Sequence, residues 1–140
     1  MTMKLYNSLT KTKEDFVPID KKHIRIYFCG PTVYNKLHVG NFRAALVGDL
    51  LSKVLKGIYP KVTYVSNITD IDDKIIAASE EANLSIDELT NKYFQQYIND
   101  SSLLGISTPD KQPFATDYIP SMISFIEVLL DRGVAYEVNG

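Results

Sequence analysis

The sequence predicts an α/β fold in which helices flank a parallel β-sheet. Three consecutive segments lead to this prediction. The apolar run Ile24–Phe28 has the residue types of a strand. Apolar residues from Asn41 onward recur at helical spacing, and a second β-branched and aromatic run follows at Lys61–Ser66. Strand, helix and strand in this order form a βαβ unit, whose two strands are parallel and joined by a right-handed crossover.

The chain is expected to begin with one short element and a loop before the first strand of the βαβ unit. Met3–Leu9 reads as a short strand or an extended lead-in, and Thr10–Lys22 reads as a charged loop. The helix after Asn41 ends at Gly57 and Pro60, because glycine and proline stop helices. Its apolar residues form one continuous stripe: Leu46, Val47, Leu50, Leu51, Val54 and Leu55.

The middle of the chain begins with a polar turn, Asn67–Asp73, that follows the second strand and leads into a helix. Its acidic residues suit a helix N-terminus, where carboxylates meet free N–H groups. Ser85 and Glu88 have the spacing of a capping box, so another helix is expected from there towards Gly105. Pro109–Pro113 breaks the helical pattern.

A last helix is predicted with Pro120 in its first turn and its end at Gly133. The residues expected to face inward are Met122, Ile123, Ile126, Leu129 and Leu130. Tyr136–Gly140 resembles a strand that stops without a cap, which suggests a piece of a longer protein.

Composition bounds the function. The chain has 140 residues, enough for one domain, and its net charge of −2 provides no general basic surface. Nucleic acid would therefore need a local patch or parts outside this chain. The single cysteine excludes an intrachain disulfide and fits a reducing compartment. No secretory signal or membrane-spanning run is present, so a cytoplasmic protein without a membrane partner is expected.

The candidate site follows the first strand, where Cys29-Gly30-Pro31 leads through a short loop to His38-Val39-Gly40-Asn41. Ligands of parallel sheets bind beyond the carboxyl ends of strands, against a helix N-terminus. His38 could hydrogen-bond a phosphate, Gly40 would allow close approach, and Asn41 could cap the helix or turn its amide to an anion. Ordinary turn chemistry explains the same residues. The sequence lacks GxxxxGK[ST] and GxGxxG, which argues against a P-loop enzyme or a dinucleotide-binding dehydrogenase.

Other chemistry-bearing residues keep alternatives open. Cys29 could be a small buried hydrophobe, a nucleophile with His38 as base, or one ligand of a metal. Asp70, Asp72 and Asp73 could bind a hard cation, but a helix start explains them equally well and magnesium is not expected there. His23 is expected to be solvated. The tyrosines Tyr93, Tyr97, Tyr118 and Tyr136 are expected to serve packing.

Taken together, YFCGPTVYNKLHVGN and the later YVSNITDIDDKII resemble the start of the cysteinyl-tRNA synthetase family, which are class I aminoacyl-tRNA synthetases. The resemblance runs from Leu5-Tyr6-Asn7-Ser8-Leu9 through LGISTPD to RGVAY and covers nearly the whole chain. It implies that residues 1–140 are the N-terminal half of a Rossmann-type (HUP-like) catalytic domain, with the HIGH-like motif in residues 31–41. The implied reaction activates L-cysteine with ATP and magnesium and transfers it to tRNA(Cys).

The resemblance also implies roles for residues. Cys29 would be one of four zinc ligands, and the zinc would bind the thiolate of the substrate, which separates cysteine from serine. His38 and Asn41 fall on the two histidine positions of HIGH, so they would stabilise the ATP phosphates, with asparagine as a departure from the literal motif. Gly40 would lie against ATP, and Thr69 would face the cysteine substrate. Two weaker predictions place Gly30 and Thr32 in the same crevice.

The remaining zinc ligands, the KMSKS loop and the tRNA-binding domain of the family fall outside this chain, so residues 1–140 alone are expected to be inactive. Three alternatives stay open: the related cysteine ligase of mycothiol synthesis, a non-catalytic paralogue that acts as a binding module, and a small nucleotidyltransferase.

Overall fold

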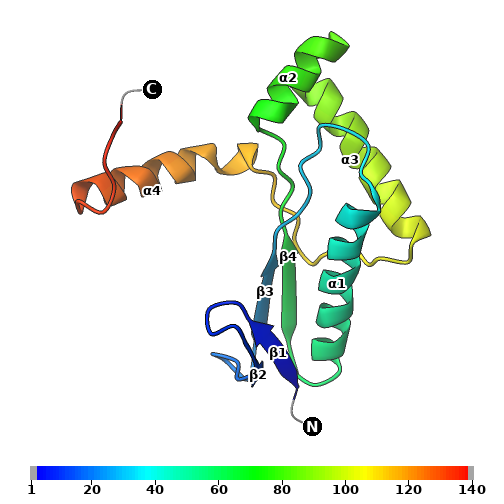
Figure 1. Ribbon diagram of the computed structural model, residues 1–140, viewed down its shortest axis with the longest axis vertical. Helices are drawn as coiled ribbons and strands as arrows, with labels where there is room; N and C mark the ends of the chain where they lie inside the picture. Colours follow the sequence, from blue (N-terminus) through cyan, green and yellow to red (C-terminus); the bar gives the residue numbers. More distant parts are fainter. Residues whose placement is uncertain (1–2, 139–140) are drawn as a thin grey trace.

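In the computed structural model, which describes residues 3–138, two parallel strands form the centre (Figure 1). They are β3 (Ile24–Phe28) and β4 (Val62–Ser66), with Ile24 opposite Val62 and Phe28 opposite Ser66. Helix α1 (Val39–Lys56) connects them and ends at Gly57. The predicted βαβ unit is therefore confirmed, and so is an α/β fold.

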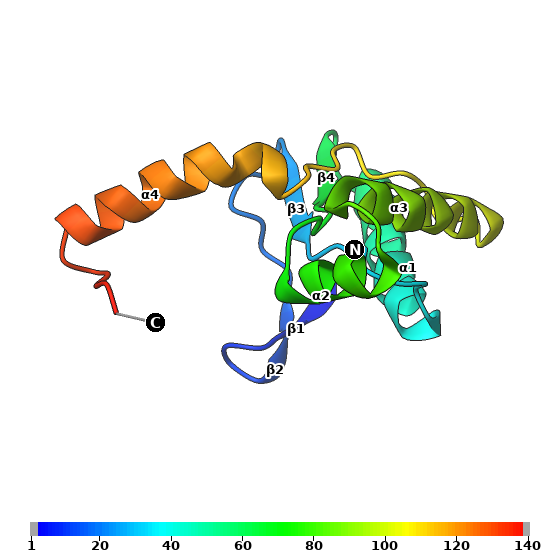
Figure 2. The same ribbon diagram turned by 90° about the horizontal axis from the view of Figure 1, so that it is seen from above.

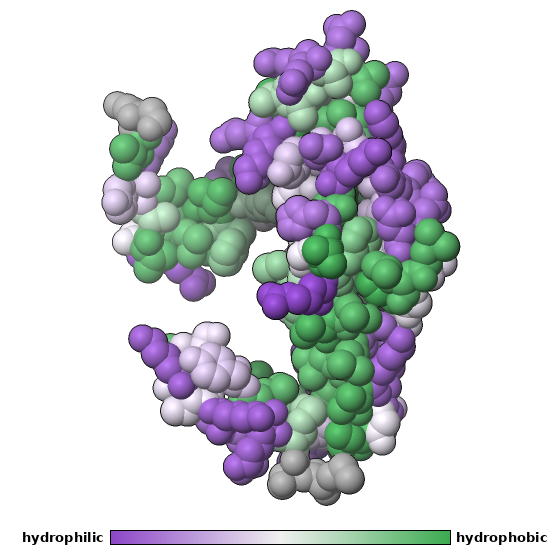
Figure 3. Space-filling view, turned by 45° about the vertical axis from the view of Figure 1, so that its right-hand side comes forward, coloured by the Kyte–Doolittle hydropathy of each residue, from purple (hydrophilic) through white to green (hydrophobic). Residues whose placement is uncertain are grey.

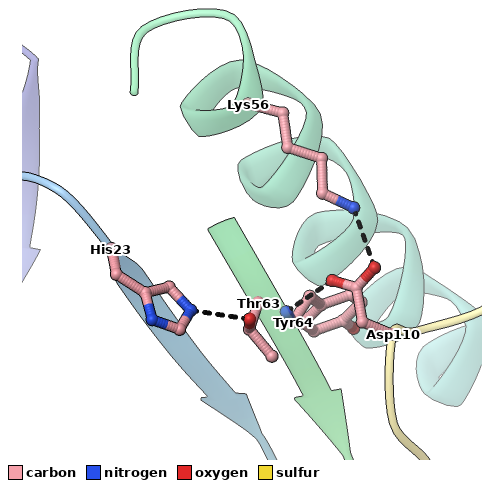
Figure 4. A network of polar contacts seen from close by, with 5 residues as sticks. All are labelled: His23, Lys56, Thr63, Tyr64 and Asp110. Atoms are coloured by element: carbon pink, nitrogen blue, oxygen red, sulfur yellow. Dashed lines mark hydrogen bonds and ion pairs between the residues drawn. The ribbon is translucent and has the colours of Figure 1, made fainter. Parts of the chain in front are cut away.

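The other edge of β4 also carries a parallel neighbour. Val65 pairs with Tyr27 of β3 on one side and with Lys111 on the other, and residues 111–115 continue this pairing through isolated bridges. Asp110 holds the segment in place, because its carboxylate accepts hydrogen bonds from the Tyr64 backbone N–H at 2.7 Å and from Lys56 at 3.3 Å (Figure 4). Among residues 3–138, only β3 and β4 form a regular parallel pair, so a complete Rossmann-type sheet goes beyond the strands described.

Helix α1 packs on the sheet with a different face from the one predicted. Its buried residues are Phe42, Gly48, Asp49, Ser52 and Leu55. Most of the apolar stripe is exposed, namely Leu46, Val47, Leu50 and Val54, and a hydrophobic surface covers α1 in Figure 3. The sheet side needs small residues because aromatic strand residues fill the space: a Cβ at Gly48 would lie 2.4 Å from the Tyr64 hydroxyl oxygen.

Two helices follow β4 and lie side by side (Figures 1 and 2). Helix α2 (Asp73–Ala82) begins after Asp72, whose carboxylate accepts the Lys74 backbone N–H. Helix α3 (Ile86–Leu103) begins with the predicted capping box, in which Ser85 and Glu88 bond each other's backbone N–H. Both helix starts are confirmed.

The hydrophobic core includes residues of the two segments that follow β3 and β4. Its buried cluster consists of Val33, Phe42, Ile68 and Tyr97. The rings of Phe42 and Tyr97 stack with centroids 6.0 Å apart, which joins α1 to α3 and confirms the packing role expected for Tyr97. Because Val33 and Ile68 are fully buried, the loops above them are anchored in the core.

Helix α4 (Ile119–Asp131) follows the single 3₁₀ turn η1 (Thr116–Tyr118) and lies across the sheet from α1 (Figure 2). Pro120 is in its first turn as predicted, and Gly133 follows with a φ of 67°. The prediction that its apolar residues face inward is wrong, since no α4 residue is buried among those described. An amphipathic helix needs a packing partner to bury its apolar face, and little of the described chain covers α4.

The N-terminal part forms a hairpin. β1 (Lys4–Asn7) confirms the predicted short strand, but it pairs in antiparallel with β2 (Thr12–Asp15), where a loop was expected. The hairpin is largely exposed, so β2 lacks the apolar alternation by which a strand is detected in sequence. At the other end, residues 135–138 form no strand, which corrects that expectation, and 139–140 lie outside the described residues. Within residues 3–138, no helix combines the length and apolarity that a membrane span requires.

Candidate active site

The segments that follow β3 and β4 meet directly beyond the ends of the strands. The Gly30 backbone N–H donates to the Asn67 side-chain oxygen at 3.0 Å. A Cβ at Gly30 would lie 1.5 Å from the Asn67 backbone oxygen, so only glycine permits this approach. Gly30 thus lies at the predicted edge of the sheet, where its structural role is to let the two segments touch.

Thr32 and Thr69 extend the parallel pairing beyond the strands. They form an isolated bridge, in which the Thr69 N–H donates to the Pro31 carbonyl at 3.0 Å and the Val33 N–H donates to the Thr69 carbonyl at 3.2 Å. The Thr69 hydroxyl oxygen accepts from the Asn67 amide at 3.1 Å, which leaves its own O–H free to donate. The structure therefore brings Thr32, Thr69 and Gly30 into one rigid platform.

His38 begins helix α1. Its ring atom Nδ1 accepts the Gly40 backbone N–H at 3.0 Å, and its own backbone N–H donates to Asn41 Oδ1 at 3.1 Å. These two bonds form a capping box. Asn41 was expected as a possible N-cap; His38 instead holds that position and Asn41 lies at the third residue of the helix. Position 40 favours glycine, because a Cβ there would lie only 2.8 Å from the His38 ring.

The capping box fixes which atoms of His38 and Asn41 remain available. Since Nδ1 of His38 accepts, the neutral ring carries its proton on Nε2. Since Oδ1 of Asn41 accepts, its Nδ2 keeps two donors. Neither Nε2 nor Nδ2 has a hydrogen-bond partner in the described part of the chain. Both side chains thus present N–H groups at the positive end of a helix, an arrangement that suits phosphate oxygens.

Cys29 directly follows β3 and lies near the start of α1. Its side chain is exposed, and together with Gly30 and Asn41 it lines a small cavity of about 60 Å³ between the strand ends and α1. A cavity of this size holds about two water molecules at ~30 Å³ each, so it is too small for a nucleotide. The structure therefore excludes one of the three alternatives for Cys29, a small buried hydrophobe, and leaves the thiol accessible.

The zinc ligation implied for Cys29 is chemically compatible with an exposed thiol, since thiolate sulfur is a preferred zinc ligand. A tetrahedral zinc site needs four ligands. No group of three or more His, Cys, Asp or Glu side chains that could hold a metal occurs within residues 3–138. A zinc site at Cys29 would therefore need further ligands from outside these residues.

The acidic residues after β4 have separate roles in the described part of the chain. Asp72 caps α2, Asp73 lies in its first turn, and Asp70 instead binds Thr116. These separate partners agree with the helix-start interpretation. His23 is also not a solvated residue as expected: it is partly buried and its Nε2 lies 2.8 Å from the Thr63 hydroxyl (Figure 4).

The larger cavity of the molecule, about 650 Å³, lies beneath α4 and has mostly apolar walls that include Tyr27, Met122 and Phe125. It contains neither Cys29 nor His38, so size alone does not locate the chemistry. Sequence reasoning missed Asn67, and it considered Asp70 only as a helix-start or cation-binding residue. Their position after β4 was visible in the sequence, but their partners, Gly30 and Thr116, lie far away along the chain.

Comparisons with known proteins agree with the motifs. The family model described as "tRNA synthetases class I (C) catalytic domain" matches residues 15–140. A cysteine–tRNA ligase of Rhodospirillum rubrum is 46% identical over 140 residues, which cover 100% of this chain. A cysteine–tRNA ligase of Wolbachia pipientis from Culex pipiens is 50% identical over 137 residues, or 98% of this chain. In both cases the match covers 30% of the relative, so the chain spans about a third of its length.

Proposed function

The chain belongs to the family of class I (C) tRNA synthetase catalytic domains, and from this premise we propose that it is the N-terminal half of the Rossmann-type catalytic domain of a cysteine–tRNA ligase. The complete protein would activate L-cysteine with ATP and magnesium and transfer it to tRNA(Cys). The observation that carries the proposal is the accessible thiol of Cys29 beside the capped N-terminus of α1, in a chain 46% identical to a cysteine–tRNA ligase.

In this reaction the carboxylate of cysteine attacks the α-phosphorus of ATP and pyrophosphate leaves. Negative charge on the phosphate oxygens must be stabilised during the substitution. His38 Nε2–H and the Asn41 amide are the donors suited to this role, because the capping box already orients both. Gly30, Thr32 and Gly40 shape the backbone around the nucleotide. The anchored position of His38 avoids the cost of ordering it when ATP binds.

Amino-acid selection is the role proposed for the other residues. Thr69 would direct its free O–H towards the substrate cysteine. Cys29 would supply one thiolate ligand to zinc, and zinc, when bound, would prefer the substrate sulfur over the oxygen of serine. A cytoplasmic location remains an expectation from the sequence.

The test is cysteine-dependent ATP–pyrophosphate exchange by the full-length gene product, followed by an acceptor assay. Exchange that requires cysteine, with serine as a poor substitute, and transfer to tRNA(Cys) would support the proposal. Transfer to the amino sugar of mycothiol synthesis in place of tRNA would favour the related ligase. A folded protein that carries no zinc and shows no cysteine-dependent exchange would favour a non-catalytic paralogue.

A further inference from the structure

Asp70 is a buried carboxylate directly next to Thr69, with only 8% of its surface exposed. Burying a carboxylate is costly unless hydrogen-bond donors compensate for the lost water. Both of its donors come from one residue, Thr116: the backbone N–H reaches one oxygen at 3.0 Å and the hydroxyl reaches the other. The neighbouring carboxylate of Asp72 is used elsewhere, since it caps α2.

Thr116 opens η1, which continues directly into α4. Asp70 therefore caps the start of this helical segment from a distant part of the chain. A backbone hydrogen bond lies next to this contact. That bond, from the Ala115 N–H to the Ile68 carbonyl at 3.0 Å, ends the parallel pairing between β4 and residues 111–115. After this last backbone bond, the hydrogen bonds between Asp70 and Thr116 hold the segment after β4 against the start of η1.

On its other side Thr69 is bound to the segment after β3, through the Pro31 carbonyl and the Val33 N–H. The Thr69 backbone is thus fixed between two neighbours, directly on one side and through Asp70 on the other. Removal of the carboxylate would release one of these two attachments and leave the direction of the Thr69 hydroxyl less defined.

We propose that Asp70 is a positioning residue, which holds Thr116 and thereby fixes the Thr69 hydroxyl for recognition of the amino acid. This inference rests on the proposed function, in which Thr69 faces cysteine. The amino-acid side of the site depends on the Asp70–Thr116 bonds, whereas the donors of His38 and Asn41 are fixed separately by their own capping box.

The experiment uses the full-length protein and measures KM for cysteine and for ATP in pyrophosphate exchange. In Asp70→Ala, KM for cysteine should rise at least about tenfold, since a misplacement of ~1 Å costs up to ~100-fold, while KM for ATP and zinc content stay unchanged. Asp70→Asn should restore the wild-type KM, because its oxygen can accept the Thr116 N–H and its amide can donate to the hydroxyl. Thr116→Ser, which keeps both bonds, is the matched control.

Thr116→Val keeps the backbone N–H and removes the hydroxyl, so it should raise KM for cysteine less than Asp70→Ala does. The double variant Asp70→Ala/Thr116→Val should be no worse than Asp70→Ala alone, because the hydroxyl then has nothing to bind. A merely structural role would lower the active fraction and leave both KM values unchanged, and that result would overturn the inference. If Asp70→Ala does not fold, Thr116→Val decides: a higher KM for cysteine with an unchanged KM for ATP supports the inference, and two unchanged KM values overturn it.

The two proposals fail differently. Wild-type protein without cysteine-dependent exchange would overturn the proposed function and this inference together. Active wild-type protein with an unchanged KM for cysteine in Asp70→Ala, or with Asp70→Asn as impaired as Asp70→Ala, would overturn only the role of Asp70.

Discussion

The two segments that leave the parallel strands use their polar side chains in opposite ways. After β4, Asn67 and Asp70 bind distant segments, and Asp72 caps α2. After β3, Cys29 is exposed and His38 keeps Nε2 free while its other ring nitrogen caps α1. The segment after β4 thus connects parts of the candidate site, whereas the segment after β3 leaves the Cys29 thiol and the His38 Nε2–H accessible. Satisfied buried groups contribute to stability, whereas exposed groups are available to a ligand with little effect on folding.

The largest effect is expected from Cys29→Ser in the full-length protein. The variant should lose zinc and discrimination between cysteine and serine, and exchange should fall by more than the roughly 100-fold that loss of an outer-sphere partner costs. Its melting temperature without zinc should match that of the wild type, because the side chain is exposed. Zinc stoichiometry by atomic absorption measures the first result. Unchanged zinc content would remove Cys29 from the metal site.

Two variants of His38 distinguish its Nε2 donor from its role as the N-cap of α1. His38→Asn should keep a helix cap but lose the Nε2 donor, so pyrophosphate exchange should fall roughly 100-fold with little change in the melting temperature. His38→Ala should lose the same activity and about 1 kcal/mol of stability in addition, because alanine cannot cap α1. Exchange assays and thermal melts on the two variants distinguish these effects. Full activity of His38→Asn would contradict the role of Nε2.

Gly30→Ala tests the close contact between the two segments. The new Cβ would overlap the Asn67 backbone oxygen, so the segments must separate, at a cost of about 1–3 kcal/mol in the free energy of unfolding. Gly57→Ala is the matched control, since Gly57 has a φ of −76° and its Cβ would approach nothing closer than 3.4 Å. Chemical denaturation of both variants measures the difference. Equal stability of the two would show that the contact is not required.

The smallest effect is expected from the dependence of stability on pH, which involves the carboxylate of Asp110. The Tyr64 backbone N–H, with Lys56 nearby, lowers the pKa of Asp110 on folding despite the opposing effect of burial. Its contribution is therefore present above the unfolded pKa of about 4 and is lost as the pH falls through the lower folded value. Asp110→Asn should reduce the loss of stability on acidification. The effect is small because 40% of the side chain is exposed, and unfolding midpoints between pH 3 and 7 measure it.

Local chemistry in the sequence predicted much of the fold correctly. The strands β1, β3 and β4 depend on residues close along the chain, and so do the helix starts at Asp72 and Ser85 and the helix ends at Gly57 and Gly133. Hydrophobic periodicity predicted α1 and α4 as helices but not which face is buried. The burial of a helix face depends on its partner: α1 meets the Tyr64 ring and needs Gly48 there, and little of the described chain covers α4.

The sequence by itself determined the βαβ unit, the family and the positions of Cys29, His38 and Asn41, because each depends on short contiguous motifs. Only the tertiary structure decided that His38 caps α1, that Gly30 lies against Asn67, and that Asp70 binds Thr116. The last two contacts join residues 37 and 46 positions apart. Such pairs form when the folded core brings distant segments together, and no local pattern identifies the partner.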